Sequence, residues 1–120
     1  MIVDMNFKIL KNRKQIEVNK NIIEFNFPIM ESLEFEDYLV VLLEIPNGVF
    51  FYENVFGVNA AGTLAWQIES VKEKEGFGQI TPFMNLWKDK SNRVRISDYM
   101  GISYIIDPAT GRILEKYLTK

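Results

Sequence analysis

Two segments that read as β-hairpins constrain the fold of this chain more than any other feature. Residues 54–69 and 102–117 each run from an apolar strand through an Asn or Asp, a short turn and a glycine into a second apolar strand. In the first segment, the Asn59 side chain can hydrogen-bond the backbone two residues on, and Gly62 can adopt the positive φ that closes the turn. In the second segment Asp107 and Gly111 have these roles in a turn that is one residue longer, so we predict a hairpin at both.

The rest of the chain consists of short apolar or alternating stretches separated by polar turns. Residues 38–45 are continuous and rich in Val and Leu, which is typical of a central strand buried on both faces. Residues 31–38 fit either a strand or one helical turn, and residues 70–80 form the longest expected loop. No long stretch has the 3.6-residue period of an amphipathic helix. We predict an all-β fold of about ten short antiparallel strands in hairpins, forming a sandwich, a barrel or a blade-like pair of sheets.

Side-chain alternation also assigns faces within the first hairpin. Leu64, Trp66 and Ile68 are expected on one side of their strand, with the residues between them on the other. Shortly before this hairpin the chain has three consecutive aromatic residues, Phe50, Phe51 and Tyr52. At least one of these three rings must therefore face the less buried side.

Length and composition limit the chemistry that this chain can perform. With 120 residues, 48% of them hydrophobic, the chain is expected to form one domain over residues 1–120. It contains no Cys and no His, which excludes disulfides, thiol nucleophiles, zinc–thiolate sites and the commonest general base. Neither the acidic residues nor Gly76 and Gly78 have the spacing of a metal or nucleotide loop. We therefore expect no metal or cofactor and no catalysis, since no convergent group of acids, Lys or Tyr is visible.

No sequence feature indicates a membrane. The first residues lack the basic and then apolar form of a secretory signal. The densest apolar run, residues 38–43, is far shorter than the ~20 residues that span a bilayer. We expect a cytoplasmic protein.

Charge is distributed unevenly, although the net charge is only −2. Residues 1–20 hold five Lys or Arg against two acidic residues, whereas residues 21–71 hold eight acidic residues and no Lys or Arg. Residues 72–120 are again basic, with nine Lys or Arg against six acidic residues. This pattern is compatible with an acidic face that attracts a basic partner. The interpretation that we favour is that basic flanks pair with the acidic middle in the folded sheets.

The two hairpins resemble the strand–D-x-x-T-G–strand repeats of quinoprotein-type β-propeller blades. The second carries Asp107, Thr110 and Gly111, and the first matches in Gly62 and in Trp66, which stands where the blade has its tryptophan. A propeller needs typically 4–8 blades, and this chain has room for two, so quinone binding does not carry over. The whole chain is also similar to small bacterial all-β proteins without an assigned function.

The leading functional prediction is a non-catalytic protein-interaction module. Exposed aromatics beside loops often anchor protein contacts, and the acidic segment favours a basic partner. The predicted contact residues are Phe77, Glu34, Glu36, Asp37 and Phe51. An immunity-type module that neutralises a basic toxin, or a regulatory protein, would be one form of such a domain.

The alternative is a β domain that binds a small ligand or carbohydrate through Trp87 and Tyr99. Self-association through an uncovered strand edge is a further expectation. Nucleic acid is not an expected partner, because the basic cluster near Trp87 stands in a chain with a pI near 5.2.

Overall fold

The protein is built of β-strands throughout the part that the structure describes. The computed structural model describes residues 6–70 and 81–118, and all regular structure within them is strand. The eleven strands are β1 (Phe7–Ile9), β2 (Gln15–Val18), β3 (Asn21–Glu24), β4 (Ile29–Phe35), β5 (Tyr38–Leu43), β6 (Val55–Asn59), β7 (Leu64–Gln67), β8 (Phe83–Lys88), β9 (Val94–Asp98), β10 (Ile102–Ile106) and β11 (Ile113–Leu118). Every pairing between them is antiparallel. The predicted all-β fold is confirmed. Residues 31–35 belong to β4, Glu36 and Asp37 form the turn after it and Tyr38 begins β5, so this segment is strand and turn rather than a helical turn.

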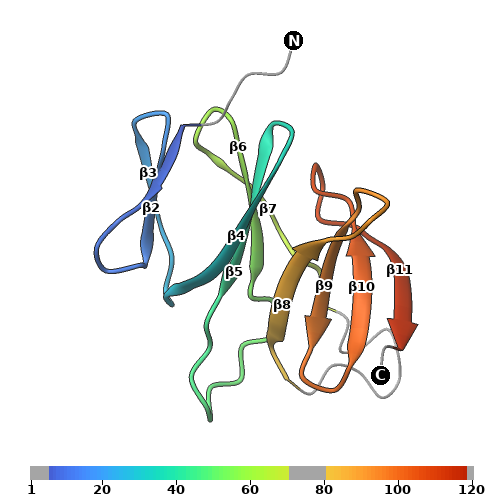
Figure 1. Ribbon diagram of the computed structural model, residues 1–120. Helices are drawn as coiled ribbons and strands as arrows, with labels where there is room; N and C mark the ends of the chain where they lie inside the picture. The colour runs from blue at the N-terminus through green and yellow to red at the C-terminus, as the bar shows by residue number, and fades with distance from the viewer. Residues whose placement is uncertain (1–5, 71–80, 119–120) are drawn as a thin grey trace.

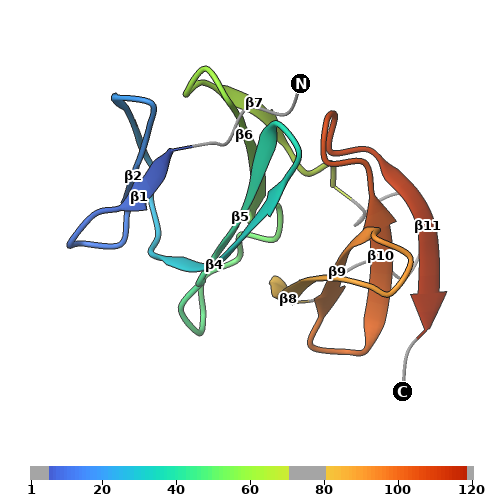
Figure 2. The same ribbon diagram turned by 45° about the horizontal axis from the view of Figure 1, so that its top comes forward.

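The strands form three separate sheets, each a meander of consecutive strands. The orders are β1-β2-β3 in the first sheet, β4-β5-β6-β7 in the second and β11-β10-β9-β8 in the third. Short turns join most neighbouring strands, which favours pairing between strands adjacent in the chain. The sheets stand side by side from the N-terminal to the C-terminal end of the molecule (Figures 1 and 2). No sheet closes into a barrel within the described residues, and those residues include no helix able to cross a membrane.

Two apolar cores lie on opposite faces of the second sheet. Leu39, Val41 and Leu43 of β5 point into the core shared with the first sheet, and Val40 and Leu42 point into the core shared with the third. All five side chains are at most 1% exposed, which confirms the prediction of a central strand buried on both faces. Burying one such side chain stabilises a fold by about 1.5–3 kcal/mol. Both cores therefore depend on side chains of β5.

The two predicted hairpins are present and close as their sequences indicate. In the β6–β7 turn the Asn59 Oδ1 atom accepts hydrogen bonds from the Ala61 and Thr63 main-chain N–H groups, both at 3.1 Å, and Gly62 has a φ of +82°. In the β10–β11 turn Asp107 accepts from Ala109 N in the same way, at 2.9 Å.

A β-bulge corrects the predicted face of Leu64. Gly57 pairs with Trp66, but Val58 pairs with Leu64, so Ala65 is an extra residue in β7. The bulge turns Leu64 to the face of Val58, where it is 51% exposed, while Trp66 and Ile68 remain buried in the core beside the third sheet. Strict alternation therefore placed Leu64 on the wrong face.

Trp66 fixes the second sheet against the third at the hairpin end. Its ring lies over Gly57 and Gly111, where an added Cβ would come within 2.1 Å and 2.4 Å of ring atoms. Its Nε1 donates to the Pro108 carbonyl oxygen at 2.8 Å. The glycines are needed here because the indole occupies the space of a side chain, and the polar edge of the ring still finds a partner.

Asn54 joins the same two sheets at their other end. Its side chain is 1% exposed, and its Nδ2 donates to the carbonyl oxygens of Leu43 and Phe83, both at 2.9 Å. Its Oδ1 accepts from Phe83 N at 3.0 Å. One amide side chain thus satisfies both main-chain groups of the residue that begins β8.

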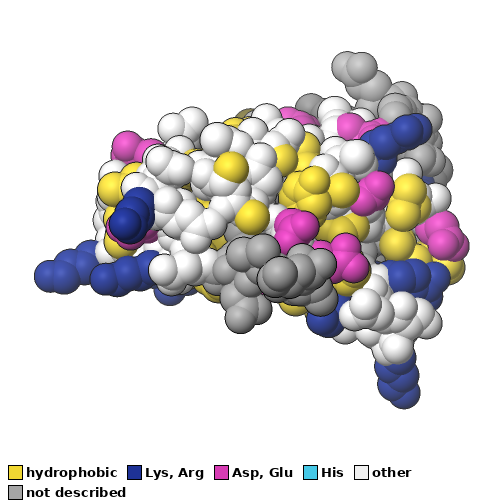
Figure 3. Space-filling view, turned by 90° about the horizontal axis from the view of Figure 1, so that it is seen from above, with side chains coloured by type: hydrophobic (Ala, Val, Ile, Leu, Met, Phe, Trp, Pro, Cys, Tyr) yellow, Lys and Arg dark blue, Asp and Glu magenta, His cyan; other side chains and the backbone are white. Residues whose placement is uncertain are grey.

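The three sheets divide the charges of the chain among themselves. The basic N-terminal segment forms the first sheet, most of the acidic residues of segment 21–71 belong to the second, and the third is again basic. Lys and Arg side chains project at both ends of the molecule when it is seen from above (Figure 3). Among the ion pairs of the third sheet, Asp89 and Glu115 bind Arg93 and Arg95 of that same sheet.

We expect the substitution Asn54→Leu to lower the free energy of unfolding by about 3 kcal/mol, because it leaves three buried main-chain groups without partners. Urea unfolding followed by tryptophan fluorescence measures this loss. Asn47→Leu, at an exposed position of the same connection, is the control and should change stability by less than about 0.5 kcal/mol. Equal effects of the two substitutions would contradict the role assigned to Asn54.

Candidate interaction site

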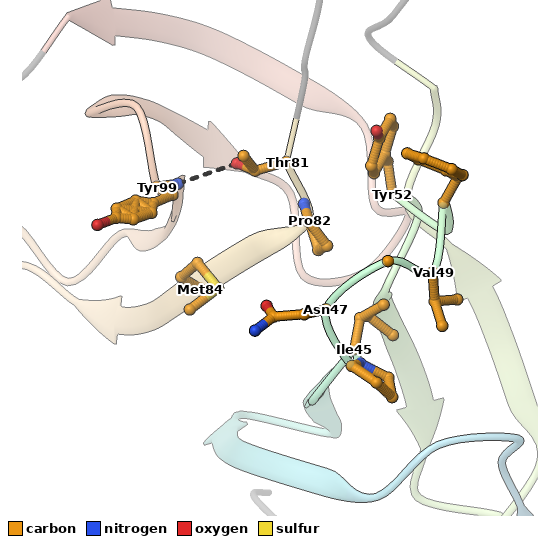
Figure 4. A pocket seen from close by; sticks show the side chains of 11 residues that line it. Ile45, Asn47, Val49, Tyr52, Thr81, Pro82, Met84 and Tyr99 are labelled. Atoms are coloured by element: carbon orange, nitrogen blue, oxygen red, sulfur yellow. Dashed lines mark hydrogen bonds between the residues drawn. The ribbon is translucent and has the colours of Figure 1, made fainter.

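An apolar groove lies between the second and third sheets, at the end where the chain leaves β5. The β5–β6 connection, residues 44–54, contributes Phe50 and Tyr52 to one side, and Met84 and Tyr99 come from the third sheet on the other (Figure 4). The groove has a volume of about 320 Å³. None of the described residues that line it carries a charge, so it is suited to apolar and aromatic groups.

The wall formed by the β5–β6 connection follows from its turn residues. Pro46 has no N–H to continue the ladder of β5, and Gly48 takes a φ of +87° that reverses the chain. Phe51 then stacks on Phe27 of the β3–β4 connection, with ring centroids 5.6 Å apart. The neighbouring Phe50 is left 84% exposed, which confirms that one of the three consecutive aromatics faces solvent.

The opposite wall is fixed by the turn between β9 and β10. Asp98 is 3% exposed, and its Oδ1 accepts hydrogen bonds from the N–H groups of Met100 at 3.0 Å and Ile102 at 3.1 Å. The main-chain N–H of Tyr99 donates to Thr81 Oγ1 at 3.2 Å (Figure 4). Tyr99 and Met100 are thereby presented on a braced turn, with 71% and 57% of their surfaces exposed.

The residues predicted to contact a protein partner are not brought together. Glu34 lies near the end of β4, and Glu36 and Asp37 form the exposed β4–β5 turn. Phe51 lies in the connection after β5, at the far end of the second sheet from that turn (Figure 1), where its ring packs on Phe27 of the β3–β4 connection. Phe77 falls outside the described residues. The acidic and aromatic parts of the prediction are thus separate surfaces.

The two residues predicted to bind a small ligand are also apart. Trp87 pairs with Arg95 near the end of β8, whereas Tyr99 follows β9 at its opposite end, beyond the pairing of Phe83 with Asp98. Tyr99 lines the groove and Trp87 does not. Only one of the two therefore belongs to the candidate site.

The basic cluster near Trp87 is partly neutralised by Asp89. The Oδ2 atom of Asp89 lies 2.7 Å from Arg95 Nε and 3.2 Å from Arg93 Nε. The hydrogen bond from Arg95, followed by that from the Arg93 main chain, lowers the pKa of Asp89 to about 2. The Arg95 guanidinium also lies 4.9 Å from the ring centre of Tyr117. Tyr117 donates a hydrogen bond to Glu115, which raises the pKa of its phenol.

The acidic side chains of the described residues do not form a metal-binding group. Within residues 6–70 and 81–118, no three Asp or Glu side chains are grouped so that they could hold a metal ion. None of the described acids beside the groove points a carboxylate into it as a lining residue. Asp98 hydrogen-bonds the main chain of its own turn, and Glu44 and Glu53 lie in the β5–β6 connection without lining the groove. What the groove offers chemically is contact with apolar and aromatic groups.

Sequence reasoning identified Tyr99 but missed Phe50 and Met84 as members of the site. The exposed position of Phe50 depends on which ring of the aromatic run packs inward, and Met84 enters the groove from a strand distant in sequence. The sequence feature that could have indicated Phe50 is the Pro-Asn-Gly turn at residues 46–48, which is directly followed by apolar residues.

Comparison with known families assigns the chain to a family but gives it no function. The fold defines a small all-β domain of three stacked antiparallel sheets. The chain belongs to the family described as a domain of unknown function (DUF7957), whose model matches residues 7–118. Neither the curated proteins nor the solved structures give a significant match. The similarity to all-β proteins without an assigned function is therefore supported, and the resemblance to propeller blades is not.

The lowered pKa of Asp89 predicts a specific pH dependence. Because its pKa is about 2 in the folded protein and 3.8 ordinarily, the Asp89 pairs stabilise the fold above pH 4 and cease to do so as the pH falls to about 2. The difference in free energy of unfolding between the wild type and Asp89→Asn should therefore shrink across that interval. Urea titrations at several pH values measure it. The narrowing should be smaller in an Arg95→Gln background, where only the hydrogen bonds from the Arg93 and Ser91 main chains and the Arg93 charge remain, and an unchanged narrowing there would contradict the assignment.

Proposed function

We propose that this domain is a protein-interaction module that binds its partner through the apolar groove between the β5–β6 connection and the β9–β10 turn. The observation that supports the proposal is the convergence of exposed Phe50, Tyr99 and Met84 on one groove. Single exposed apolar residues are common, but a shared site with several of them marks a contact surface more often than chance exposure.

The groove has the composition of an interface centre. Aromatic residues and Met are enriched at such centres, and charged residues are depleted there. Both walls are held by defined contacts, the Phe51–Phe27 stack on one side and the Asp98 hydrogen bonds on the other. A preformed groove costs less ordering on binding, so a larger part of the contact energy contributes to affinity. A partner that inserts an apolar side chain between Phe50 and Tyr99 fits this site.

The acids near the groove indicate the charge of that partner. Glu44 and Glu53 flank the groove-lining part of the connection, and residues 21–71 contain no Lys or Arg. Complementary charge at the rim of an interface increases the rate of association and selects among partners. A basic partner, as predicted from the sequence, agrees with this rim. An immunity-type or regulatory role remains a hypothesis of the same class.

Replacing both Phe50 and Tyr99 by Ser should weaken partner binding about 30-fold or more, because both residues would be anchors of the interface. Quantitative affinity capture from the source cells, followed by titration of the captured partner, measures the change. Leu64→Ser combined with Leu114→Ser removes two exposed apolar side chains elsewhere and is the matched control. A partner retained equally by both double variants would refute binding through the groove.

A small-ligand function is the second candidate, favoured by the size of the groove. Its volume of about 320 Å³ falls at the lower end of the range of small-molecule sites. Tyr52 and Tyr99 provide rings at its two ends (Figure 4). Under this hypothesis a screen of sugars and metabolites should contain a compound that raises the melting temperature of the wild type but not of Tyr99→Ser. A screen without any such compound would count against it.

A further inference from the structure

The three sheets repeat one arrangement, and in the part of the chain that the structure describes the first repeat has one strand fewer. Asn54, which precedes β6, binds both main-chain groups of Phe83, the first residue of the next sheet. Arg13, which precedes β2, does the same for Ile29: Ile29 N donates to the Arg13 carbonyl oxygen at 2.6 Å, and Arg13 Nε donates to the Ile29 carbonyl oxygen at 3.1 Å. The β1–β2 turn therefore corresponds to the β5–β6 connection.

A second contact gives the same correspondence from the other end of the sheets. Gly111 in the β10–β11 turn lies against Trp66 of β7, and Gly62 in the β6–β7 turn lies against Asn21 of β3. In both cases a Cβ added to the glycine would meet the last strand of the preceding sheet, within 2.4 Å of Trp66 and 2.8 Å of Asn21. Hence β1, β2 and β3 correspond to β5, β6 and β7. Within residues 6–70, the first sheet has no equivalent of β4 or β8, and such a strand would lie beside β1.

The edge of β1 at that place has main-chain groups available for pairing. Leu10 N donates to the Gln15 carbonyl oxygen at 3.0 Å, so every second residue of β1 faces β2. By alternation, the N–H and C=O groups of Phe7 and Ile9 point away from β2. No strand of the described residues pairs with them on that side. The Ile9 side chain is 38% exposed at the same edge.

The face of β4 beside this edge is polar where its equivalent on β8 is buried. Ser32 and Glu34 share the face of Val41 and Leu39, toward the first sheet, and they correspond to Leu86 and Lys88 on β8. Leu86 is 8% exposed because the second sheet covers it. Ser32 is half-buried where Leu86 is buried, and within the described residues no strand of the first sheet covers it; Glu34 is exposed, as is its equivalent Lys88. A strand added at β1 would place its side chains over these two residues.

We propose that the free edge of β1 accepts an extended segment of a partner protein as the fourth strand of the first sheet, with a Lys or Arg on the side that faces β4. Main-chain hydrogen bonds to Phe7 and Ile9 supply affinity in such strand addition, and the side chains toward β4 select the sequence. Glu34 favours a basic residue there. On the opposite face the added strand lies next to Lys8, where a neutral or acidic residue is preferred.

Charge also favours a partner over a second copy of this chain. The strand β1 and the turn after it carry Lys8, Lys11, Arg13 and Lys14. Two copies pairing edge to edge at β1 would bring these like charges together, which opposes association. The edge is separate from the groove assigned to the proposed function, so each surface can fail on its own.

The test selects peptides from a phage-displayed library of random dodecapeptides on the intact chain, and then measures a fluorescein-labelled selected peptide by anisotropy. We expect alternating sequences with a Lys or Arg at one of the positions that face β4. Ile9→Pro removes an outward N–H and should weaken binding about tenfold or more. Ile22→Pro, at the outward position on the β3 edge of the same sheet, is the matched control and should bind as the wild type does. Glu34→Lys should weaken binding, and Glu31→Lys on the other face of β4 should not.

A second measurement does not depend on the folding of any variant. Peptide binding to the wild type should slow hydrogen exchange of the Phe7 and Ile9 amides, and a copy of the peptide N-methylated at alternate positions should not bind. The proposal is overturned if no peptide is enriched, if Ile9→Pro and Ile22→Pro bind equally, or if the two amides gain no protection. Self-association of the wild type that Ile9→Pro abolishes would assign the edge to a second copy and would also overturn it.

Discussion

The placement of one sheet on the next depends on a polar side chain that binds the first residue of the following strand. Hydrogen-bonded ladders hold strands together within each sheet but do not connect the sheets. Apolar packing brings the sheets together without fixing their direction, because the hydrophobic effect is not directional. Asn54 and Arg13 supply the direction, since each binds both main-chain groups of the residue that starts the next sheet. Removing one such bridge leaves buried backbone groups unpaired, which costs more than the net gain of an ordinary hydrogen bond.

The candidate functional surfaces lie where the repeated arrangement is interrupted. The β5–β6 connection is far longer than the β1–β2 turn to which it corresponds, and its additional residues form one wall of the groove. The first sheet has three strands where the others have four, which leaves the edge of β1 unpaired in the described chain. Both irregular parts lie outside the two apolar cores, so a substitution there leaves the core packing in place.

Local signals in the sequence predicted the strands and turns well, and long-range contacts explain what it did not predict. Asn59 and Gly62 specify their turn within four residues, and the run from Tyr38 to Leu43 shows a doubly buried strand by composition alone. The bulge at Ala65 is different, because it depends on how β7 meets β6 and the Trp66 ring. The groove combines three segments separated in the chain, so its existence depends on how the sheets stack.

The uneven charge of the sequence is reproduced in the fold as a difference in charge between the sheets. Because each sheet is a meander of consecutive strands, a run of like charge in the sequence remains within one sheet. Pairing between basic flanks and an acidic middle would require oppositely charged segments to alternate within a sheet. In this fold they occupy different sheets, and Asp89 binds its arginines inside the third sheet. Acidic residues of the second sheet, Glu34 among them, face solvent at its margins and give this part of the surface a negative potential.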